Sequence, residues 1–176
     1  MGMRFYDLKS FYIVSDIQEH KENKDKLLSL IDDAESSSYQ GISKTDWHLP
    51  KETKRPYLDF FYPMIAPYLT KISGRLQGNK WQIHNSWFQQ YSKTESHGWH
   101  THGEVNYANV YFLNLPDEGM KTQFYDISDH KISGEVNVKE GQLLTFPAYI
   151  LHRSPPNISD SVKTIISFNC DFYSEF

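Results

Sequence analysis

The segment that most constrains this 176-residue chain runs from His97 to Asn114 and reads HGWHTHGEVNYANVYFLN. Three histidines fall within six residues, and a glutamate and then an apolar strand-like run follow them. Side chains two positions apart in a strand or its extension point to the same face, so His102 and Glu104 can offer an imidazole nitrogen and a carboxylate oxygen to one metal ion. The segment therefore predicts part of a metal site beside a strand.

A second histidine segment, GQLLTFPAYILHRSPP, begins at Gly141 and supplies a third candidate ligand. It has the pattern of a glycine-led apolar strand followed by a turn, with His152 near its end. Two histidines and one carboxylate on one face leave the remaining coordination positions open, which is the arrangement of non-haem Fe(II) oxygenases. His102, Glu104 and His152 are therefore the predicted metal ligands.

His100 provides an alternative to the carboxylate, because it also lies two residues from His102. Three neutral imidazoles would leave a bound iron more positive, and a carboxylate suits the harder Fe(II) ion better. This argument favours Glu104 as the ligand. His97 and His100 are then expected beside the ligands or at the pocket mouth, where His100 can hydrogen-bond to a ligand.

The chain changes character near residue 80. Before it, apolar residues recur at helical spacing and a Ser-rich segment with glycine reads as a loop. After it, short strand-like segments follow one another closely, which is typical of a sandwich or jelly roll. Pro63 and Pro67 are expected to kink or divide the second helix. The expected early elements are a strand over 3–14, helices over 17–35 and 56–76, and a loop over 36–53.

Composition and length narrow the function classes. A net charge of −4 argues against a nucleic-acid-binding surface, which is usually basic. No apolar run approaches the ~20 residues that span a bilayer, and the N-terminal residues do not read as a secretory signal. Cys170 is the only cysteine, so a disulfide within the chain is impossible and the reducing cytoplasm is the expected location. The length favours one domain over residues 1–176, with a supporting part at 1–78 and a core at 80–172.

The two histidine segments together resemble the catalytic half of the 2-oxoglutarate/Fe(II)-dependent dioxygenases, most of all the small prolyl-hydroxylase-like members of marine bacteria and their phages. That family has His-x-Asp/Glu, a strand, a Gly-led strand ending in Phe-Pro, a distal histidine and then a basic residue on the next strand. Residues 80–172 contain each part in this order. The resemblance implies a mainly β fold, the double-stranded β-helix (a cupin-like jelly roll), with N-terminal flanking helices.

The resemblance also implies a chemistry. Fe(II) would be the cofactor, 2-oxoglutarate and dioxygen the cosubstrates, and the reaction a hydroxylation coupled to decarboxylation of 2-oxoglutarate to succinate. Lys163 matches the basic residue that pairs with the distal carboxylate of 2-oxoglutarate, and Tyr91 matches a pocket tyrosine of prolyl-hydroxylase-like relatives. Phe112 stands where many relatives carry another tyrosine. The primary substrate, a peptide or a small molecule, is expected to meet variable loops at 36–53 and 126–133.

The strand around Lys163 supports this interpretation from its own pattern. Lys163, Ile165, Ser167 and Asn169 share one face, as expected for a polar pocket lining. The alternative is that Lys163 is a solvated strand lysine, as most lysines are. Two other functions also stay open: a cupin-type metal oxygenase that needs no 2-oxo acid, and a jelly-roll binding module without enzymatic activity. A cation inside the fold would favour the first interpretation over both.

Overall fold

The computed structural model describes residues 3–4, 9–39, 42–132 and 136–175. Two α-helices and a short 3-10 helix (Glu118–Met120) accompany a set of antiparallel strands in this part of the chain. The helices are α1 (His20–Asp32) and α2 (Pro56–Arg75). The strands are β1 (Ile13–Asp16), β2 (Ser37–Tyr39), β3 (Ser43–Thr45), β4 (Lys80–Tyr91), β5 (His97–His100), β6 (Tyr107–Asn114), β7 (Gln123–Asp126), β8 (Lys131–Ile132), β9 (Gln142–Pro147), β10 (His152–Ser154) and β11 (Lys163–Tyr173).

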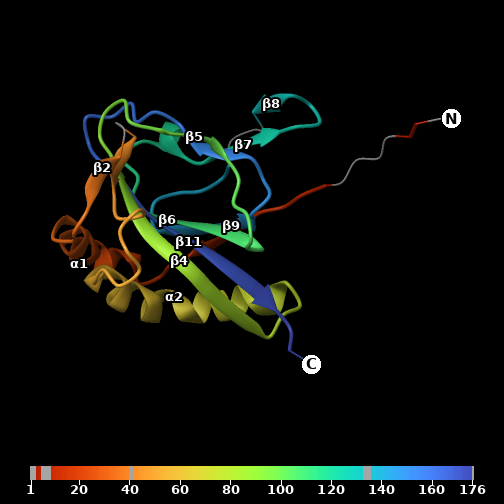
Figure 1. The fold of residues 1–176 in the computed structure, drawn as a ribbon, viewed down its shortest axis with the longest axis horizontal. Coiled ribbons are helices and arrows are strands. Elements are labelled where there is room, and N and C mark those ends of the chain that lie inside the picture. The colour runs from red at the N-terminus through yellow and green to blue at the C-terminus, as the bar shows by residue number, and fades with distance from the viewer. Residues whose placement is uncertain (1–2, 5–8, 40–41, 133–135, 176) are drawn as a thin grey trace.

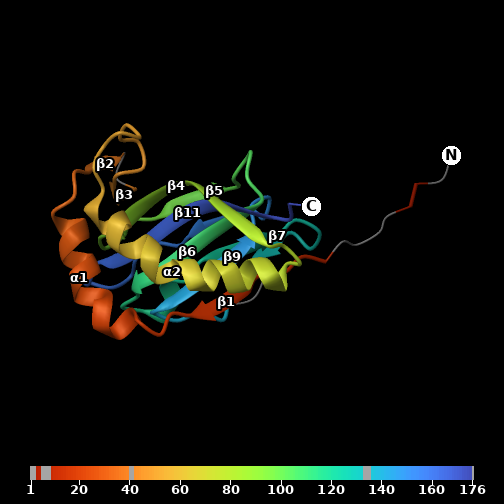
Figure 2. The same ribbon diagram turned by 90° about the horizontal axis from the view of Figure 1, so that it is seen from below.

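The strands form two sheets. The large sheet has the order β1-β9-β6-β11-β4-β3-β2, and the small sheet has the order β5-β10-β7-β8. Both helices cover one face of the large sheet, and the small sheet lies over its other face (Figures 1 and 2). This arrangement confirms the predicted mainly β fold with flanking helices, although the sheets are open and do not close into a barrel.

The large sheet has one hydrophobic cluster on each face because the side chains of its strands alternate. Ile166 and Phe168 of β11 belong to the cluster under the helices, together with Phe61 of α2. Ile165 of the same strand belongs to the cluster on the other face, which includes Phe124 of the small sheet. The helices therefore stabilise one face, and the space between the sheets is left for the second cluster and a cavity.

The N-terminal part differs from its prediction in three respects. Two short strands, β2 and β3, lie within the predicted loop at 36–53, where three-residue strands give too little pattern to be recognised. Helix α2 continues past Pro63 and Pro67 and is not divided. Only residues 13 and 14 of the strand expected over 3–14 belong to β1, and residues 3–4 and 9–12 are not strand. Residues 1–2 and 5–8 lie outside the described residues. Neither described helix is long and apolar enough to cross a membrane.

Candidate metal centre and cosubstrate pocket

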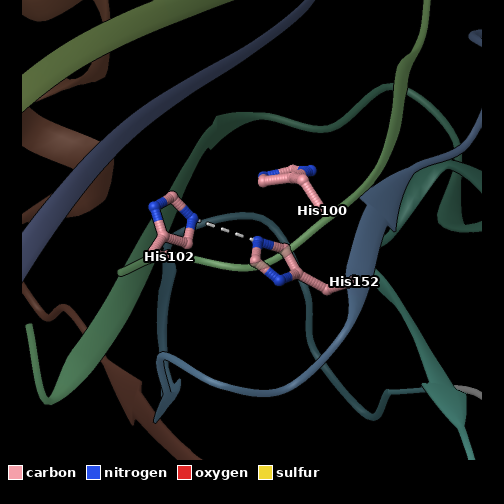
Figure 3. A group of neighbouring side chains, drawn as sticks. All are labelled: His100, His102 and His152. Atoms are coloured by element: carbon pink, nitrogen blue, oxygen red, sulfur yellow. Dashed lines mark hydrogen bonds between the residues drawn. The ribbon is translucent and has the colours of Figure 1, made fainter. Parts of the chain in front are cut away.

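Three histidines meet in the space between the two sheets. His100 ends β5, His152 begins β10, and the two residues are directly paired in the small sheet. His102 follows β5, and its backbone N–H donates to the Ala148 carbonyl at 3.0 Å. One ligand nitrogen from each ring lies within 4.8 Å of the others, so the three side chains are placed to hold one metal ion (Figure 3).

The tautomers of this group suit metal binding. The Nδ1 atoms of His100 and His152 each lie 2.8 Å from a carbonyl oxygen, those of Gly98 and Ile150. A carbonyl only accepts, so Nδ1 carries the proton and Nε2 keeps its lone pair for a metal. The Nε2 atoms of His102 and His152 are 3.3 Å apart and face each other (Figure 3).

Burial keeps these rings neutral. It lowers the pKa of His102 to about 4 and that of His152 to about 3, and it also lowers the pKa of His100. The neighbouring imidazoles act in the same direction on His102 and His152, because each protonated ring would repel the next. Metal ions bind the neutral form of imidazole, so protons do not compete for this group near neutral pH.

The structure places the predicted ligand Glu104 outside this group, and His100 takes the third position. His102 and Glu104 do not alternate as strand residues in this structure, because β5 ends at His100 and the chain bends at Glu104 with a φ of 63°. Glu104 is exposed to solvent. The His-x-His alternative, which the sequence also offered, agrees with the geometry.

A fourth histidine supports the group. The ring of His97 stacks on that of His100, with centroids 4.1 Å apart and an angle of 18° between the planes. Gln89 of β4 lies with its Nε2 atom 3.3 Å from His97 Nδ1. Burial lowers the pKa of His97 to about 4. His97 is therefore a neutral, packed neighbour of the candidate ligands.

The histidines line a cavity whose opposite wall is the inner face of β4, β6 and β11. Trp87 of β4 approaches His102, with ring centroids 6.0 Å apart. Ser154, two residues after His152, also lines the cavity and was not singled out from the sequence, although its i+2 position places it on the face of the ligand. No described residue of 36–53 or 126–133 contributes to the lining.

Lys163 is buried beside this cavity and is not a solvated lysine. Its side chain is 1% exposed, and its Nζ donates to the Met120 carbonyl at 2.6 Å and to Ser154 Oγ at 2.7 Å. Among the described residues, no carboxylate pairs with it. Burial lowers the pKa of Lys163 to about 7. An ammonium in this position lacks an anionic partner.

Tyr91 is the direct cross-strand partner of Lys163, and the lysine Nζ lies 5.1 Å from the centroid of its ring. The residue is 1% exposed and lines the cavity. Its hydroxyl makes no well-aligned hydrogen bond, although Ser154 is close enough to affect it. Burial raises the pKa of Tyr91, so the hydroxyl keeps its proton and remains a donor. Lys163 and Tyr91 thus form a polar corner in which the lysine has two neutral acceptors but no anion, and the Tyr91 hydroxyl has no acceptor.

Comparison with known proteins gives structural relatives alone: no protein-family model matches the sequence, and neither does a curated protein. A crystal structure of the viral collagen prolyl hydroxylase of Paramecium Bursaria Chlorella virus-1 with 2-oxoglutarate is 15% identical, with a TM-score of 0.62 over 90% of this chain and 94% of that one. HygX of Streptomyces hygroscopicus with nickel, 2-oxoglutarate and hygromycin B is 9% identical, with a TM-score of 0.69 over 95% and 86%. A 2OG-Fe(II) oxygenase family protein of Burkholderia pseudomallei is 9% identical, with a TM-score of 0.66 over 92% and 84%.

These structures define the class of fold. The chain is folded like the 2-oxoglutarate/Fe(II) oxygenases, along almost its whole length, and one relative is a small viral prolyl hydroxylase. The resemblance predicted from the two histidine segments is confirmed for the fold. At these identities the reaction has to be argued from the residues of the cavity.

Proposed function

We propose that this protein is a 2-oxoglutarate- and Fe(II)-dependent oxygenase that hydroxylates its substrate. The observation that carries the proposal is Lys163, a buried cation without a carboxylate partner beside a cavity lined by three neutral histidines. Burying an ammonium is unfavourable unless something compensates for the lost hydration. The distal carboxylate of 2-oxoglutarate is the compensating anion in this interpretation.

The side chains present fit both groups. His100, His102 and His152 would hold the metal, each through a nitrogen that burial keeps unprotonated. Lys163 and the Tyr91 hydroxyl would hold the distal carboxylate, which accepts from both donors. When bound, iron and 2-oxoglutarate supply the activation of dioxygen and the decarboxylation to succinate.

The protein's own contribution is orientation and exclusion of water. Lys163 and Tyr91 sit opposite each other on β11 and β4, whose long antiparallel pairing fixes their separation. Phe112 and Ile165, both buried, line the inner face next to them and keep this corner apolar apart from its two donors. A dicarboxylate held by these two donors would share with the histidines the cavity that Tyr91 also lines.

The third ligand is His100 in this proposal and not Glu104. His100 is paired with His152 in the small sheet and has its Nδ1 proton committed to a carbonyl, whereas Glu104 is exposed in a bend. The metal would then carry three neutral ligands and no protein carboxylate, which departs from the two-histidine, one-carboxylate set.

This departure favours a second candidate function, a cupin-type metal oxygenase that needs no 2-oxo acid. The three-histidine group by itself does not require a cosubstrate with a carboxylate. Lys163 and Tyr91 distinguish the candidates, since without such a cosubstrate the buried lysine has no anionic partner and the Tyr91 hydroxyl has no acceptor. The non-enzymatic binding module explains neither feature.

The test is the addition of Fe(II) and 2-oxoglutarate without oxygen, followed by visible absorption spectroscopy. We expect a charge-transfer band in the wild type that weakens strongly in Lys163→Met at the same 2-oxoglutarate concentration. Release of succinate in air, without any primary substrate, is the second readout. Iron binding without a 2-oxoglutarate-dependent band or succinate would reject the proposal in favour of the cupin-type oxygenase.

The primary substrate is a peptide or a small molecule, and both classes occur among the structural relatives, since one is called a collagen prolyl hydroxylase and another was determined with hygromycin B.

The proposal retains one domain over residues 1–176, because β1 and β3 join the large sheet through β9 and β4. It also retains a reducing cytoplasm: Cys170 is a buried free thiol, and burial raises its pKa to about 12.

A further inference from the structure

Asn169 presents a buried, unpaired acceptor to the cavity, far from the corner formed by Lys163 and Tyr91. Three buried side-chain polar atoms lack a hydrogen bond among the described residues: Ser43 Oγ, Tyr91 Oη and Asn169 Oδ1. Two of these residues, Tyr91 and Asn169, line the cavity. Buried polar atoms are nearly always paired, so each exception needs an explanation. The 2-oxoglutarate carboxylate explains Tyr91 and leaves Asn169 without a partner.

The register of β11 shows that one cosubstrate molecule cannot explain both atoms. Lys163 and Asn169 lie on the same face of the strand, six residues apart. An extended strand rises about 3.4 Å per residue, so their backbones are separated by roughly 20 Å. A five-carbon dicarboxylate is much shorter than this distance. Lys163 and Asn169 therefore contact different ligands, or different parts of one assembly of ligands.

The candidate metal centre lies between these two ends. His102 approaches Trp87, and Trp87 pairs with Ser167 across the strands. Gln89, which pairs with Ile165, contacts His97, so the histidine group faces β11 between Ile165 and Ser167. Ile165 is two residues from Lys163 and Ser167 is two residues from Asn169, each roughly 7 Å along the strand. Asn169 thus lies two residues beyond the candidate metal centre along β11, on the side away from the Lys163 corner. A substrate to be oxidised has to approach the metal from such a position.

The surroundings of Asn169 define what this position can recognise. Asn169 is 7% exposed, and its cross-strand neighbour on β6 is the small apolar Ala108. Trp87 and Val110, both buried, line the adjacent wall. A largely apolar wall with one unpaired amide oxygen favours a compact group that carries a hydrogen-bond donor, because an acceptor left unpaired on binding lowers the affinity.

We propose that the part of the cavity formed by Trp87, Ser167 and Asn169 binds the primary substrate, and that Asn169 Oδ1 accepts a hydrogen bond from it. The substrate therefore carries an N–H or O–H donor near the carbon that is oxidised. Its apolar portion packs on Trp87. This inference rests on the proposed function, because it takes the metal as the reacting centre and the Lys163 corner as the place of the cosubstrate.

The experiment uses the full chain, labelled with 15N and loaded with Zn(II) and 2-oxoglutarate, so that no oxidation occurs. The probes are N-methylacetamide, which has one N–H donor, and N,N-dimethylacetamide, which has none. 2-Propanol tests whether a hydroxyl donor serves as well. Each probe is titrated while the indole N–H signal of Trp87, which also lines the cavity, is followed in the wild type and in every variant. This signal is assigned by its loss in Trp87→Phe.

We expect the wild type to bind N-methylacetamide about two- to tenfold more tightly than N,N-dimethylacetamide, the usual worth of one neutral hydrogen bond. Asn169→Leu should bring the ratio to about one, and Asn169→Asp, which keeps an acceptor, should preserve it. Asn85→Leu is the matched control: Asn85 is the cross-strand partner of Asn169 but is exposed and does not line the cavity. It should keep the wild-type ratio.

Three results would overturn the proposal. One is equal affinity of the two amides for the wild type, and another is an unchanged ratio in Asn169→Leu with thermal unfolding like that of the wild type. The third is a Kd for 2-oxoglutarate that rises in Asn169→Leu, since the residue would then hold the cosubstrate. Failure of the proposed function is recognised separately, because the wild type would then bind no 2-oxoglutarate while the amide ratio could still be measured with Zn(II) alone.

Discussion

The histidine group lines the cavity and the Lys163 corner lies beside it, and the two are built on different supports. The histidines come from β5 and β10, which are four and three residues long, and from the bend that follows β5. Lys163 and Tyr91 stand on β11 and β4, paired along most of their eleven and twelve residues. Long regular strands fix the position of a charge, whereas short strands and the bend after β5 bring several rings together in a set that depends on local backbone geometry.

The two regions also handle charge differently. The imidazole rings stay neutral, because burial and repulsion between neighbouring rings lower the pKa values of His102 and His152 well below 7. Lys163 is also buried, and burial alone lowers its pKa to about 7. Its amine can therefore take up a proton when an anion binds. One region is thus prepared for a cation and the other for an anion, and substitutions should separate them.

The largest effect is expected at the histidines. His102→Ala or His152→Ala removes one of three candidate ligands and should weaken metal binding by more than about 100-fold, since changes to residues that only support ligands already cost 10- to 100-fold. Calorimetric titration with Co(II) measures this directly. His84→Ala is the control, because His84 pairs with Asp171 at the surface. Near-wild-type affinity in either ligand variant would remove that residue from the set.

The next comparison places His100 against Glu104. His100→Ala should lose most metal binding, and Glu104→Ala should lose little, because only His100 lies within the group. His100→Asp should recover binding, as a carboxylate can replace an imidazole nitrogen at Fe(II). The same titration checks all three variants. Loss of binding in Glu104→Ala with retention in His100→Ala would show that Glu104 swings inward when metal binds.

His100 and Glu104 show how far the alternation of side chains can be used to predict a site from the sequence. Alternation of side chains correctly placed Lys163, Ile165, Ser167 and Asn169 on one face, because β11 is long and continues without a break. The same rule does not extend to Glu104 in this structure, because it holds only as far as a strand continues and β5 ends at His100. No local pattern in HGWHTHGE marks that end. Glu104 as a ligand stays a prediction that the metal titrations test.

A second case has the same cause. Strict alternation along β4 would place Ile83 on the face of Trp87. A bulge opposite Asn169 and Cys170 shifts the register, so Ile83 pairs with Cys170 and packs on the helix side. A bulge inserts one residue and reverses the faces beyond it. The overall fold was predictable from the order of motifs, but positions next to strand ends and bulges were not.

A smaller effect is expected at the anion corner. Lys163→Met should raise the KM for 2-oxoglutarate roughly ten- to a hundredfold while metal affinity stays close to that of the wild type, since a hydrogen bond to a charged group contributes about 1.5–3 kcal/mol. Pyruvate lacks the distal carboxylate, so the preference for 2-oxoglutarate over pyruvate should fall in parallel. The ratio of the two kcat/KM values is the measurement.

Lys121→Met is the matched control for this substitution. Lys121 is also buried, but its ammonium already pairs with Glu118 at 2.9 Å. Its loss should leave the preference between the two oxo acids unchanged. If Lys163→Met also left that preference unchanged, the distal carboxylate would have another partner, and the Lys163 corner would lose its assigned role without affecting the metal centre.

The smallest expected effect is the uptake of a proton by the protein when 2-oxoglutarate binds. Burial lowers the pKa of Lys163 to about 7, so at pH 8 most of the free protein has a neutral amine there. A bound carboxylate favours the charged form and raises this pKa, so binding 2-oxoglutarate should take up close to one proton at pH 8 and much less at pH 6, where the lysine is already charged. The affinity should therefore fall as the pH rises above about 7.

Calorimetry of the Zn(II)-loaded protein in buffers with different ionisation enthalpies counts the protons, and Lys163→Met should abolish the uptake. Uptake that persisted in this variant would assign the proton to another group and would mean that Lys163 is already charged before the anion binds.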